Sequence, residues 1–143
     1  MAERIYIAAS FEQREEVRSL YKKLIEAGHT ITADWTQHKE LAQIESEEER
    51  RQLKVDYAIE DVDGVKTATV YALLTGDRKS TGAHIELGIA LGADIGRICL
   101  IGNPDESQLF YSHPSVTIYP DTNSFIDSSA VFMAFRVLCR TAS

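Results

Sequence analysis

The sequence of 143 residues has few cysteines and a shortage of positive charge, and both exclude kinds of protein. Cys99 and Cys139, the two cysteines, have no histidine or cysteine at ligand spacing. This spacing excludes a zinc finger or a disulfide framework and predicts two core thiols in a reducing compartment. The formal net charge of -7 argues against binding the phosphate backbone of a nucleic-acid polymer. A small anionic ligand is still allowed, because amides at a helix start bind anions without net positive charge.

Long apolar runs are missing as well. No run approaches the length of a membrane span, and the first residues, MAERIYIAAS, lack the apolar core of a signal peptide. The sequence therefore predicts a cytoplasmic protein with no membrane partner. Its length and its composition, 44% hydrophobic and 26% charged, predict a single folded domain over residues 1–143.

Short apolar runs alternate with helical patterns along the chain. Strands are predicted in the five segments RIYIAAS, HTITADW, TATVYALLTG, GRICLIG and SVTIYP. Helices are predicted in FEQREEVRSLYKKLIEAGH, in residues 38–63, in STGAHIELGIALGA and in SFIDSSAVFMAFRVLCR. In the second helix the candidate inward positions are Leu41, Ile44, Leu53, Tyr57 and Ile59. The alternation predicts an α/β fold, a mainly parallel five-stranded sheet with helices on both faces, as in Rossmann or flavodoxin-like three-layer sandwiches.

Residues that directly follow the predicted strands are candidates for ligand binding, because open parallel sheets bind ligands beyond the carboxyl ends of their strands. Ser10 and Phe11 follow the first strand, and Trp35 follows the second. Ser10 is expected either to hydrogen-bond a ligand oxygen or to cap the next helix. An exposed Trp35 would stack on a planar base, and the alternative is that it packs in the core. The loop GDRKSTG lacks the spacing of a Walker phosphate-binding loop.

Glu86 breaks the pattern of an otherwise apolar helix. A helix that is apolar on all sides is expected to be buried, and a buried glutamate is expected to be paired or functional. The Ser-Thr pair at the start can cap this helix, and Gly82 lets a ligand approach the backbone. Glu86 is therefore a candidate nucleophile or proton carrier. The alternative is a buried ion pair with His84, Arg97 or a residue of a partner subunit.

A second carboxylate is expected near Glu86. The predicted helix over residues 38–63 leads into the third strand, so that one of Glu60, Asp61 and Asp63 can approach Glu86. Paired carboxylates are the usual equipment for breaking glycosidic bonds. The alternative is that all three acids are surface charges, and spacing alone does not choose among them.

Three segments in this order, RIYIAASF, DVDGVKTATVYALLTG and STGAHIELGIALG, resemble the nucleoside 2-deoxyribosyltransferase family, which includes related 2'-deoxynucleoside 5'-monophosphate N-glycosidases. The resemblance runs from residue 4 to about residue 120, and its most specific part is the Gly-x-x-x-Glu-x-Gly pattern around Glu86. The resemblance implies that Glu86 attacks the anomeric carbon and forms a covalent glycosyl-enzyme. It also implies that Asp61 orients or protonates the substrate and that Tyr6 lies close to Glu86.

Ser80 departs from the pattern of the free-nucleoside transferases, which often have an aspartate at this position. A serine here resembles the 5'-monophosphate N-glycosidases and implies that Ser10 and Ser80 bind a phosphate. Ser112 is a further candidate, at a position that is usually supplied across a subunit interface. The resemblance implies a nucleoside or nucleotide as the small-molecule partner, no cofactor and no metal, and a homodimer or higher homo-oligomer.

Three functions stay open at this point. The first is cleavage of the N-glycosidic bond, with the sugar passing to another base or to water, and no residue decides between these acceptors. The second is a catalytically silent nucleotide-binding or sensing module, against which the presence of both Asp61 and Glu86 argues. The third is a hydrolase that cleaves NAD. A redox dinucleotide fold is disfavoured because no Gly-x-Gly-x-x-Gly follows the first strand.

Overall fold

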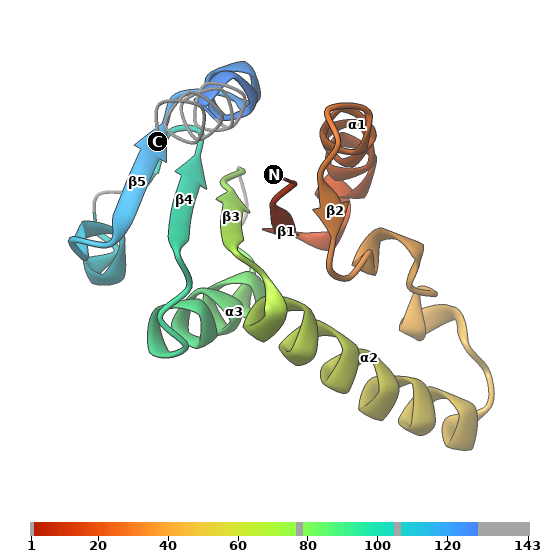
Figure 1. Ribbon diagram of the computed structural model, residues 1–143. Helices are drawn as coiled ribbons and strands as arrows, with labels where there is room; N and C mark the ends of the chain where they lie inside the picture. Colours follow the sequence, from red (N-terminus) through yellow and green to blue (C-terminus); the bar gives the residue numbers. More distant parts are fainter. Residues whose placement is uncertain (1, 77–78, 105–106, 129–143) are drawn as a thin grey trace.

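Five parallel strands form one sheet in this computed structural model, which describes residues 2–76, 79–104 and 107–128 (Figure 1). The strands are β1 (Arg4–Ala8), β2 (Thr30–Ile31), β3 (Val70–Leu74), β4 (Arg97–Ile101) and β5 (Val116–Tyr119). Their order is β2-β1-β3-β4-β5, and every neighbouring pair is parallel. This is the flavodoxin-like order, so that the predicted fold class is confirmed.

Helices cover both faces of the sheet. They are α1 (Arg14–Glu26), α2 (Glu47–Thr67) and α3 (Thr81–Gly92), with short 3-10 helices at η1 (Phe11–Gln13), η2 (Trp35–Gln37), η3 (Leu41–Gln43) and η4 (Leu109–Ser112). Residues 122–128 are also helical, and the remainder of the predicted closing helix, with Cys139, lies outside the described residues. Figure 1 shows α1 and residues 122–128 on one face, and α2 and α3 on the other. No helix in the described part of the chain is long and apolar enough to cross a membrane.

The central strands are apolar without interruption because both of their faces are covered. All five residues of β3 are buried, and so are the last four of β1 and of β4. Cys99 in β4 is fully buried, which confirms the prediction of a core thiol for this cysteine, and burial raises the pKa of its thiol to about 11. Helix α1 packs its apolar stripe on this sheet and ends before Gly28, whose φ of 95° an L side chain rarely adopts.

Helix α2 differs from the prediction. It begins only at Glu47, after the Ser46 hydroxyl accepts a hydrogen bond from the Glu49 amide at 3.2 Å. None of the five expected inward positions belongs to the buried core, and Ile59 is 58% exposed. The reason is visible in Figure 1, where most of α2 extends beyond the edge of the sheet. Only its last turns reach β1, and Gly64 is needed there because a Cβ would lie 2.7 Å from the Ala33 Cβ.

The apolar sequence of helix α3 predicts burial on all sides, but the structure buries only one side of it. Ala83, Leu87 and Ala90 face the sheet and are buried, whereas Ile85 on the outer side is 61% exposed. A helix in the outer layer of a sandwich has one face toward the sheet, so its other apolar residues remain open within a single chain.

Candidate active site

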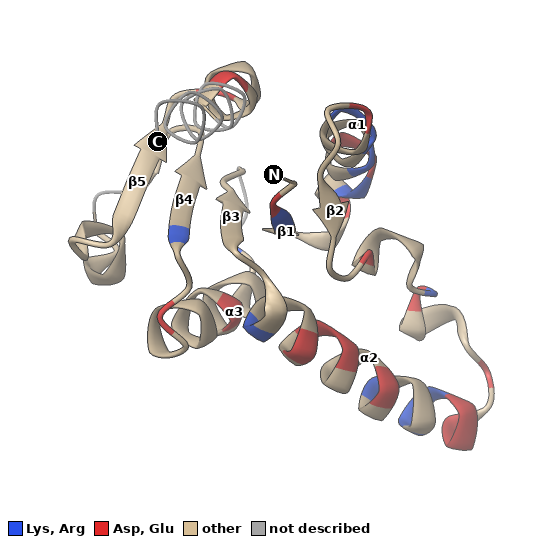
Figure 2. Ribbon diagram, viewed as in Figure 1, with Lys and Arg blue, Asp and Glu red and all other residues tan. Residues whose placement is uncertain are grey.

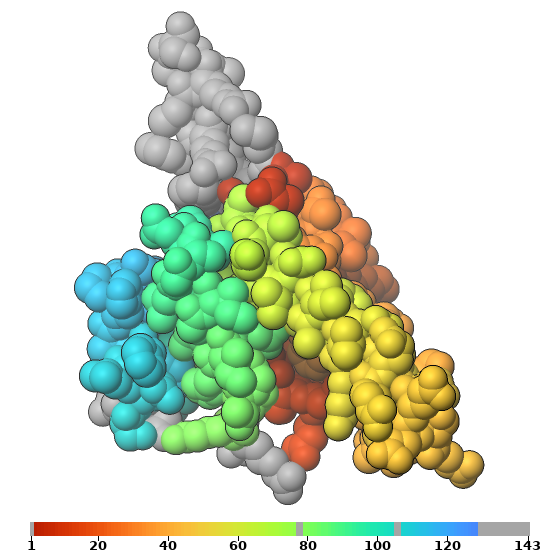
Figure 3. Space-filling model, turned by 90° about the horizontal axis from the view of Figure 1, so that it is seen from below, coloured from red at the N-terminus to blue at the C-terminus, as the bar shows by residue number. Residues whose placement is uncertain are grey.

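Strands β1 and β3 end side by side at the point where the strand order reverses, which is where flavodoxin-like sheets bind ligands. Two groups of side chains lie at this edge. One is a cluster of carboxylates and a tyrosine between α2, α3 and β1. The other lines a cavity above the ends of β1 and β3. Figure 3 views the molecule from the α2 and α3 side and shows a hollow between these helices, with residues of the N-terminal segment in red at its floor.

Tyr6 and Glu86 are joined by a hydrogen bond, in which the Tyr6 hydroxyl donates to Oε2 of Glu86. Tyr6 is fully buried in β1, and its ring stacks on Tyr71 of β3 at 6.2 Å between centroids. Burial, followed by the negative charges of Glu86 and Asp61, raises the pKa of Tyr6, so that its hydroxyl keeps the proton that it donates. A buried tyrosine of this kind fixes the direction of the Glu86 carboxylate.

The Glu86 carboxylate lies in surroundings that favour its neutral form. Burial raises its pKa to about 7, the charge of Asp61 acts in the same direction, and the hydrogen bond from Tyr6 opposes both. The ion pair with His84 or Arg97 is not what the structure shows. His84 is hydrogen-bonded to Ser80 and Tyr111. Arg97 is the first residue of β4 and lies at the end of the sheet away from the carboxyl ends of the strands. A carboxylate with a pKa near 7 is available in both protonation states at neutral pH.

Asp61 is the acid of α2 that comes near Glu86. Glu60 and Asp63 are exposed, whereas the Asp61 side chain is 28% exposed and its charge acts on both Tyr6 and Glu86. Burial raises the pKa of Asp61, with Glu60 adding to the rise, while His38 and a hydrogen bond with Tyr6 lower it. Two carboxylates with raised pKa values therefore share the Tyr6 hydroxyl, an arrangement suited to acid–base and nucleophilic chemistry.

His38 lies beside this cluster, and no local sequence pattern indicates it. Its ring stacks on Tyr57 with 3.7 Å between centroids, and its Nε2 lies 3.4 Å from Glu60 Oε2 and 4.0 Å from Asp61 Oδ1. Within the described residues, His38 Nε2 and Asp61 Oδ1 are both buried without a hydrogen-bond partner. Buried polar atoms without partners are uncommon in native proteins and are found at sites that bind or react.

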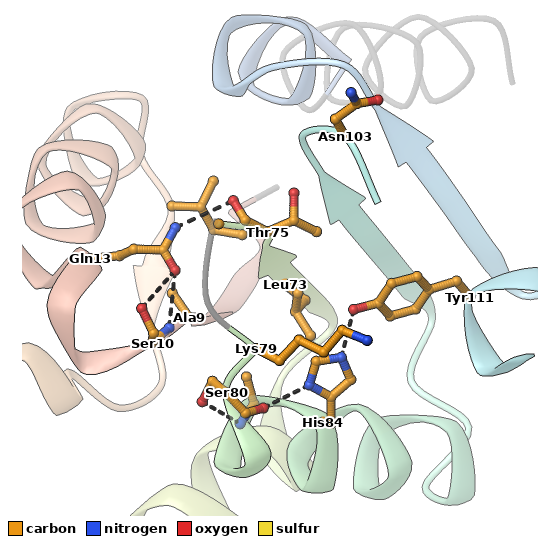
Figure 4. Close-up of a pocket in the computed structure, with 13 residues that line it drawn as sticks. Ala9, Ser10, Gln13, Leu73, Thr75, Lys79, Ser80, His84, Asn103 and Tyr111 are labelled. Atoms are coloured by element: carbon orange, nitrogen blue, oxygen red, sulfur yellow. Dashed lines mark hydrogen bonds between the residues drawn. The ribbon is translucent and has the colours of Figure 1, made fainter. Parts of the chain in front are cut away.

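The cavity has a volume of about 210 Å³ and lies between β1, β3, η4 and the start of α3 (Figure 4). Its polar lining comes from Ser10, Gln13, Thr75, Lys79, Ser80, His84, Asn103 and Tyr111. Of the described residues that line it, none is acidic and Lys79 carries the one formal charge. In a chain with net charge -7, a cavity at a helix start whose described lining has no carboxylate is suited to an anion.

Ser10 and Ser80 both line this cavity (Figure 4). Ser80 caps α3, because its hydroxyl accepts a hydrogen bond from the Ala83 amide at 3.2 Å. Ser10 precedes η1, and its hydroxyl lies 3.0 Å from Gln13 Oε1. Each serine thus combines a capping position with a place in the cavity wall.

The carboxylate cluster and the cavity are separate but close. Glu86, Tyr6 and Asp61 do not belong to the cavity lining. Ser80 precedes Glu86 by six residues on the same helix, which corresponds to about 9 Å along the helix axis.

The remaining predicted residues are placed less favourably. Trp35 is 7% exposed and its indole N–H donates to the Ile7 carbonyl at 2.7 Å, so the alternative of core packing is correct and an exposed stacking surface is wrong. Phe11 is half-buried, and the centroid of its ring lies 6.4 Å from that of Trp35. Gly82 is exposed, and a Cβ added to it would lie 3.9 Å from Ser80 Oγ. Ser112 is exposed on η4 and does not line the cavity, whereas the neighbouring Tyr111 does.

Sequence reasoning missed three residues at this edge, namely His38, His84 as a cavity residue, and Tyr111. His38 and Tyr111 lie in segments without a catalytic motif, and His84 lies inside the Gly-x-x-x-Glu-x-Gly pattern, in which Glu86 is the residue that stands out. Within the described residues, no group of three or more histidine, cysteine, aspartate or glutamate side chains is arranged to hold a metal ion.

These features define an α/β protein with paired carboxylates next to a serine-lined cavity at the switch point of a flavodoxin-like sheet. No family model matches the sequence, and no curated protein matches it. Among solved structures, the fold is similar to that of the CMP N-glycosidase BcmB of Clostridium botulinum, with a TM-score of 0.60 and 17% identity over 90% of this chain and 99% of that one. It is also similar to the 2-deoxyribosyltransferase of Bacillus psychrosaccharolyticus, with a TM-score of 0.62 and 22% identity over 86% of this chain and 90% of that one.

A third solved structure limits what this similarity means. The TIR domain of the Toll-related receptor TRR-2 from Hydra magnipapillata gives a TM-score of 0.56 at 19% identity, over 98% of each chain. Two enzymes that act on nucleosides or nucleotides and a receptor domain therefore share this fold with the chain. The resemblance predicted from sequence is confirmed in the fold, and the activity has to be argued from the side chains of the site.

Proposed function

We propose that this protein cleaves the N-glycosidic bond of deoxynucleosides or their 5'-monophosphates, through a covalent intermediate on Glu86. The observation that carries the proposal is the Tyr6–Glu86–Asp61 cluster, which lies about 9 Å along α3 from a serine-lined cavity. The fold similarity to an N-glycosidase and a deoxyribosyltransferase supports it.

In this mechanism Glu86 acts as the ionised nucleophile. Its oxygen bonds to the anomeric carbon while the bond from that carbon to the base nitrogen breaks, with the electron pair leaving on the base. The Tyr6 hydroxyl orients the carboxylate and is already a donor to it in the free protein. Water or a second base then attacks the anomeric carbon and gives a proton to Asp61, which has by then lost its own proton to the departing base. The bond from the anomeric carbon to Glu86 breaks in this step, which releases the sugar and restores the Glu86 carboxylate.

Asp61 is proposed as the group that delivers a proton to the departing base. Burial raises its pKa to about 6, which leaves a fraction of Asp61 protonated for this step near neutral pH, and His38 lies beside it. A proton on Asp61 also removes the repulsion between its charge and the ionised Glu86. The two acids thereby take different roles, which is how paired carboxylates break glycosidic bonds.

The cavity is proposed to bind the 5'-phosphate. Ser10 and Ser80 offer hydroxyl groups, Lys79 offers a positive charge, and the first turn of α3 offers its amides. The free-nucleoside transferases often have an aspartate at the position of Ser80, and a hydroxyl in its place avoids repulsion of a phosphate. For this reason we propose the monophosphate as the preferred substrate. Phe11, a half-buried ring that follows β1, is proposed to contact the base, and Trp35 packs against it.

A homodimer is proposed to cover the outer apolar residues of α2 and α3. Val55, Ile59 and Val62 of α2 are exposed by 48%, 58% and 38%, and Ile85 of α3 by 61%. Such an exposed apolar surface is typical of a subunit interface. In the dimer Ser112 would act in the site of the partner subunit. Sedimentation of the protein with and without Ile59→Glu tests this, and a monomer in both cases would contradict it.

The activity is tested by incubating the protein with deoxynucleosides and their 5'-monophosphates, with and without a second free base, and following the bases by chromatography. Release from monophosphates without an acceptor identifies a nucleotide hydrolase, and exchange between bases identifies a transferase. Glu86→Gln should abolish either reaction, whereas Glu16→Gln on the exposed side of α1 should not. Intact mass spectrometry of quenched reactions should show a glycosyl adduct in the wild type and none in Glu86→Gln.

Two outcomes contradict the proposal. Tight nucleotide binding without base release from any substrate would identify a silent binding module. Release of nicotinamide from NAD, with no release from nucleosides or monophosphates, would identify an NAD-cleaving hydrolase.

A further inference from the structure

His38 is a buried ring beside Asp61, the proposed proton donor, and several contacts hold it in place. Its side chain is 13% exposed, and its ring lies parallel to that of Tyr57 on α2, with 3.7 Å between centroids and 6° between the planes. The Tyr57 hydroxyl accepts a hydrogen bond from the Lys39 amide at 2.9 Å. The His38 amide donates to the Trp35 carbonyl at 3.0 Å. The stack and these two backbone contacts fix the position of the His38 ring.

The His38 ring is directed at carboxylates of α2. Acidic residues occur along the whole of this helix (Figure 2), and Nε2 of His38 lies 3.4 Å from Oε2 of Glu60 and 4.0 Å from Oδ1 of Asp61. A carboxylate oxygen only accepts hydrogen bonds, so a lone pair on Nε2 would be repelled at this place. We therefore assign a proton to Nε2 in the neutral ring as well as in the charged ring, and the arrangement requires no particular charge on His38.

Two atoms of this arrangement lack a hydrogen bond. Within the described residues, Nε2 of His38 and Oδ1 of Asp61 are both buried without a hydrogen-bond partner, even though Glu60 lies near. Their separation of 4.0 Å is about 1 Å longer than an ordinary N–H···O bond. Hydrogen bonds that serve catalysis are often long in a free enzyme and tighten in the reacting complex. The two atoms are a donor and an acceptor, and a shift of about 1 Å would join them.

Other ionisable groups near this pair do not replace the contact. Glu60 is 47% exposed, so that water solvates its charge. The Lys39 side chain is exposed and forms an ion pair elsewhere on α2. From β1, Tyr6 forms a hydrogen bond with the Asp61 carboxyl, but Oδ1 is left unpaired. Of these groups, His38 is the one with a buried donor near the unpaired oxygen.

We propose that His38 is the positioning residue of Asp61, and that its Nε2–H donates to Oδ1 once the Asp61 proton has passed to the departing base. In that step the bond from the anomeric carbon to the base nitrogen breaks, the base keeps the electron pair and takes the proton, and Asp61 becomes a buried carboxylate. A buried charge is costly unless it is hydrogen-bonded, and the bond from His38 stabilises it while His38 keeps its own proton. When the acceptor gives a proton back to Asp61, the bond lengthens again. The inference deepens the proposed function and rests on it for the reaction.

The choice of leaving group separates this role from a structural one. A nucleobase needs a proton to leave as a neutral molecule, whereas 4-nitrophenolate leaves as an anion. His38→Phe can still stack on Tyr57 but has no N–H, and its kcat/KM for base release should fall about 10- to 100-fold, the effect of one hydrogen bond to a charged group. With 4-nitrophenyl 2-deoxyriboside 5'-phosphate, followed by absorbance, the same variant should lose less than about threefold.

Two further variants test the same point by rescue and by a matched control. His38→Gln places an amide N–H at about the reach of Nε2 and should regain most of the base release. His113→Phe makes the first substitution at an exposed histidine of another segment and should leave both rates unchanged. If the phenyl ring is not tolerated at residue 38 and urea unfolding shows a loss of the fold, His38→Leu serves for the same comparison.

The ionisation of Asp61 gives a readout that requires no turnover. His38 lowers the pKa of the Asp61 carboxyl, and Glu60 raises it. An NMR titration of labelled carboxyl carbons, with the Asp61 signal assigned from Asp61→Asn, should therefore show a higher pKa for Asp61 in His38→Phe and a lower one in Glu60→Gln. In His113→Phe the pKa of Asp61 should stay at its wild-type value.

The inference is overturned by a wild-type rate of base release in His38→Phe, by equal losses with both leaving groups, or by an unchanged pKa of Asp61 in this variant. A higher pKa of Asp61 in His38→Phe, with no base release from any substrate by the wild type, supports the contact and contradicts the proposed function alone. Base release by the wild type, with no dependence of the Asp61 pKa on His38, contradicts this inference alone.

Discussion

Replacing Glu86 by glutamine is expected to stabilise the fold at alkaline pH, although it removes the proposed nucleophile. Glutamine has nearly the same shape, and its side-chain oxygen still accepts the hydrogen bond from Tyr6. It carries no charge that burial and Asp61 can disfavour. Stability and activity should therefore change in opposite directions at this residue, as is common where a site holds a group in an unfavourable state.

The magnitude follows from the pKa of Glu86, which is raised in the folded protein from 4.5 to about 7. At 1.36 kcal/mol for each pKa unit, this corresponds to about 3 kcal/mol. Because the folded state holds the proton more tightly, the contribution to stability is complete below pH 4.5 and is lost as the pH rises through about 7. The wild type should lose stability relative to Glu86→Gln over this window, and the difference should level off above it.

The assay is urea unfolding of both proteins between pH 5 and about 8.5, with the free energy of unfolding extrapolated to water. The advantage of Glu86→Gln should grow by about 2.5 kcal/mol over this range, most of the full effect. Glu16→Gln, at an exposed residue of α1, should show no such growth. A difference between wild type and Glu86→Gln that stays constant with pH would refute the reasoning, because Glu86 would then not be destabilised by its surroundings.

Three further predictions concern the same edge of the sheet. Tyr6→Phe removes the hydrogen bond that lowers the pKa of Glu86, so the acid limb of the pH profile of kcat/KM should move to higher pH; a profile at the wild-type position would contradict this. Ser80→Asp keeps a helix cap but puts a carboxylate in the cavity, where it repels a phosphate. In steady-state kinetics, KM should therefore rise at least about tenfold for a monophosphate and little for its nucleoside. Gly64→Ala should destabilise the fold by about 1–3 kcal/mol in urea unfolding, because its Cβ would lie 3.1 Å from the Tyr6 ring, whereas Gly88→Ala, which meets nothing within 4 Å, should not.

The order of strands and helices was predictable from the sequence because it follows from local patterns. Residues of β1, β3 and β4 form short uninterrupted apolar runs, and runs of this kind arise where both faces of a sheet are covered. The helical period between them then predicts parallel strands joined by crossover helices. Ser80 as the cap of α3 and Glu86 as a polar residue in an apolar helix are equally local features.

Burial on α2 and α3 was not predictable from these patterns. An apolar stripe shows that a helix has a partner for that face, but it does not identify the partner. Ile59 and Ile85 look like core residues in the sequence, yet both are more than half exposed in the single chain. The direction of α2 relative to the sheet decides this, and that direction depends on how Gly64 packs against Ala33 and Tyr6.

Local sequence alone determined the fold class of this protein and marked Glu86 as unusual, because each depends on the residues within one strand or one helix. Only the tertiary structure brought together Tyr6 and Glu86, which are 80 residues apart, and His84 and Tyr111, which are 27 apart. A parallel sheet gathers the carboxyl ends of strands that are distant in the chain, and side chains meet there through packing that no local pattern encodes.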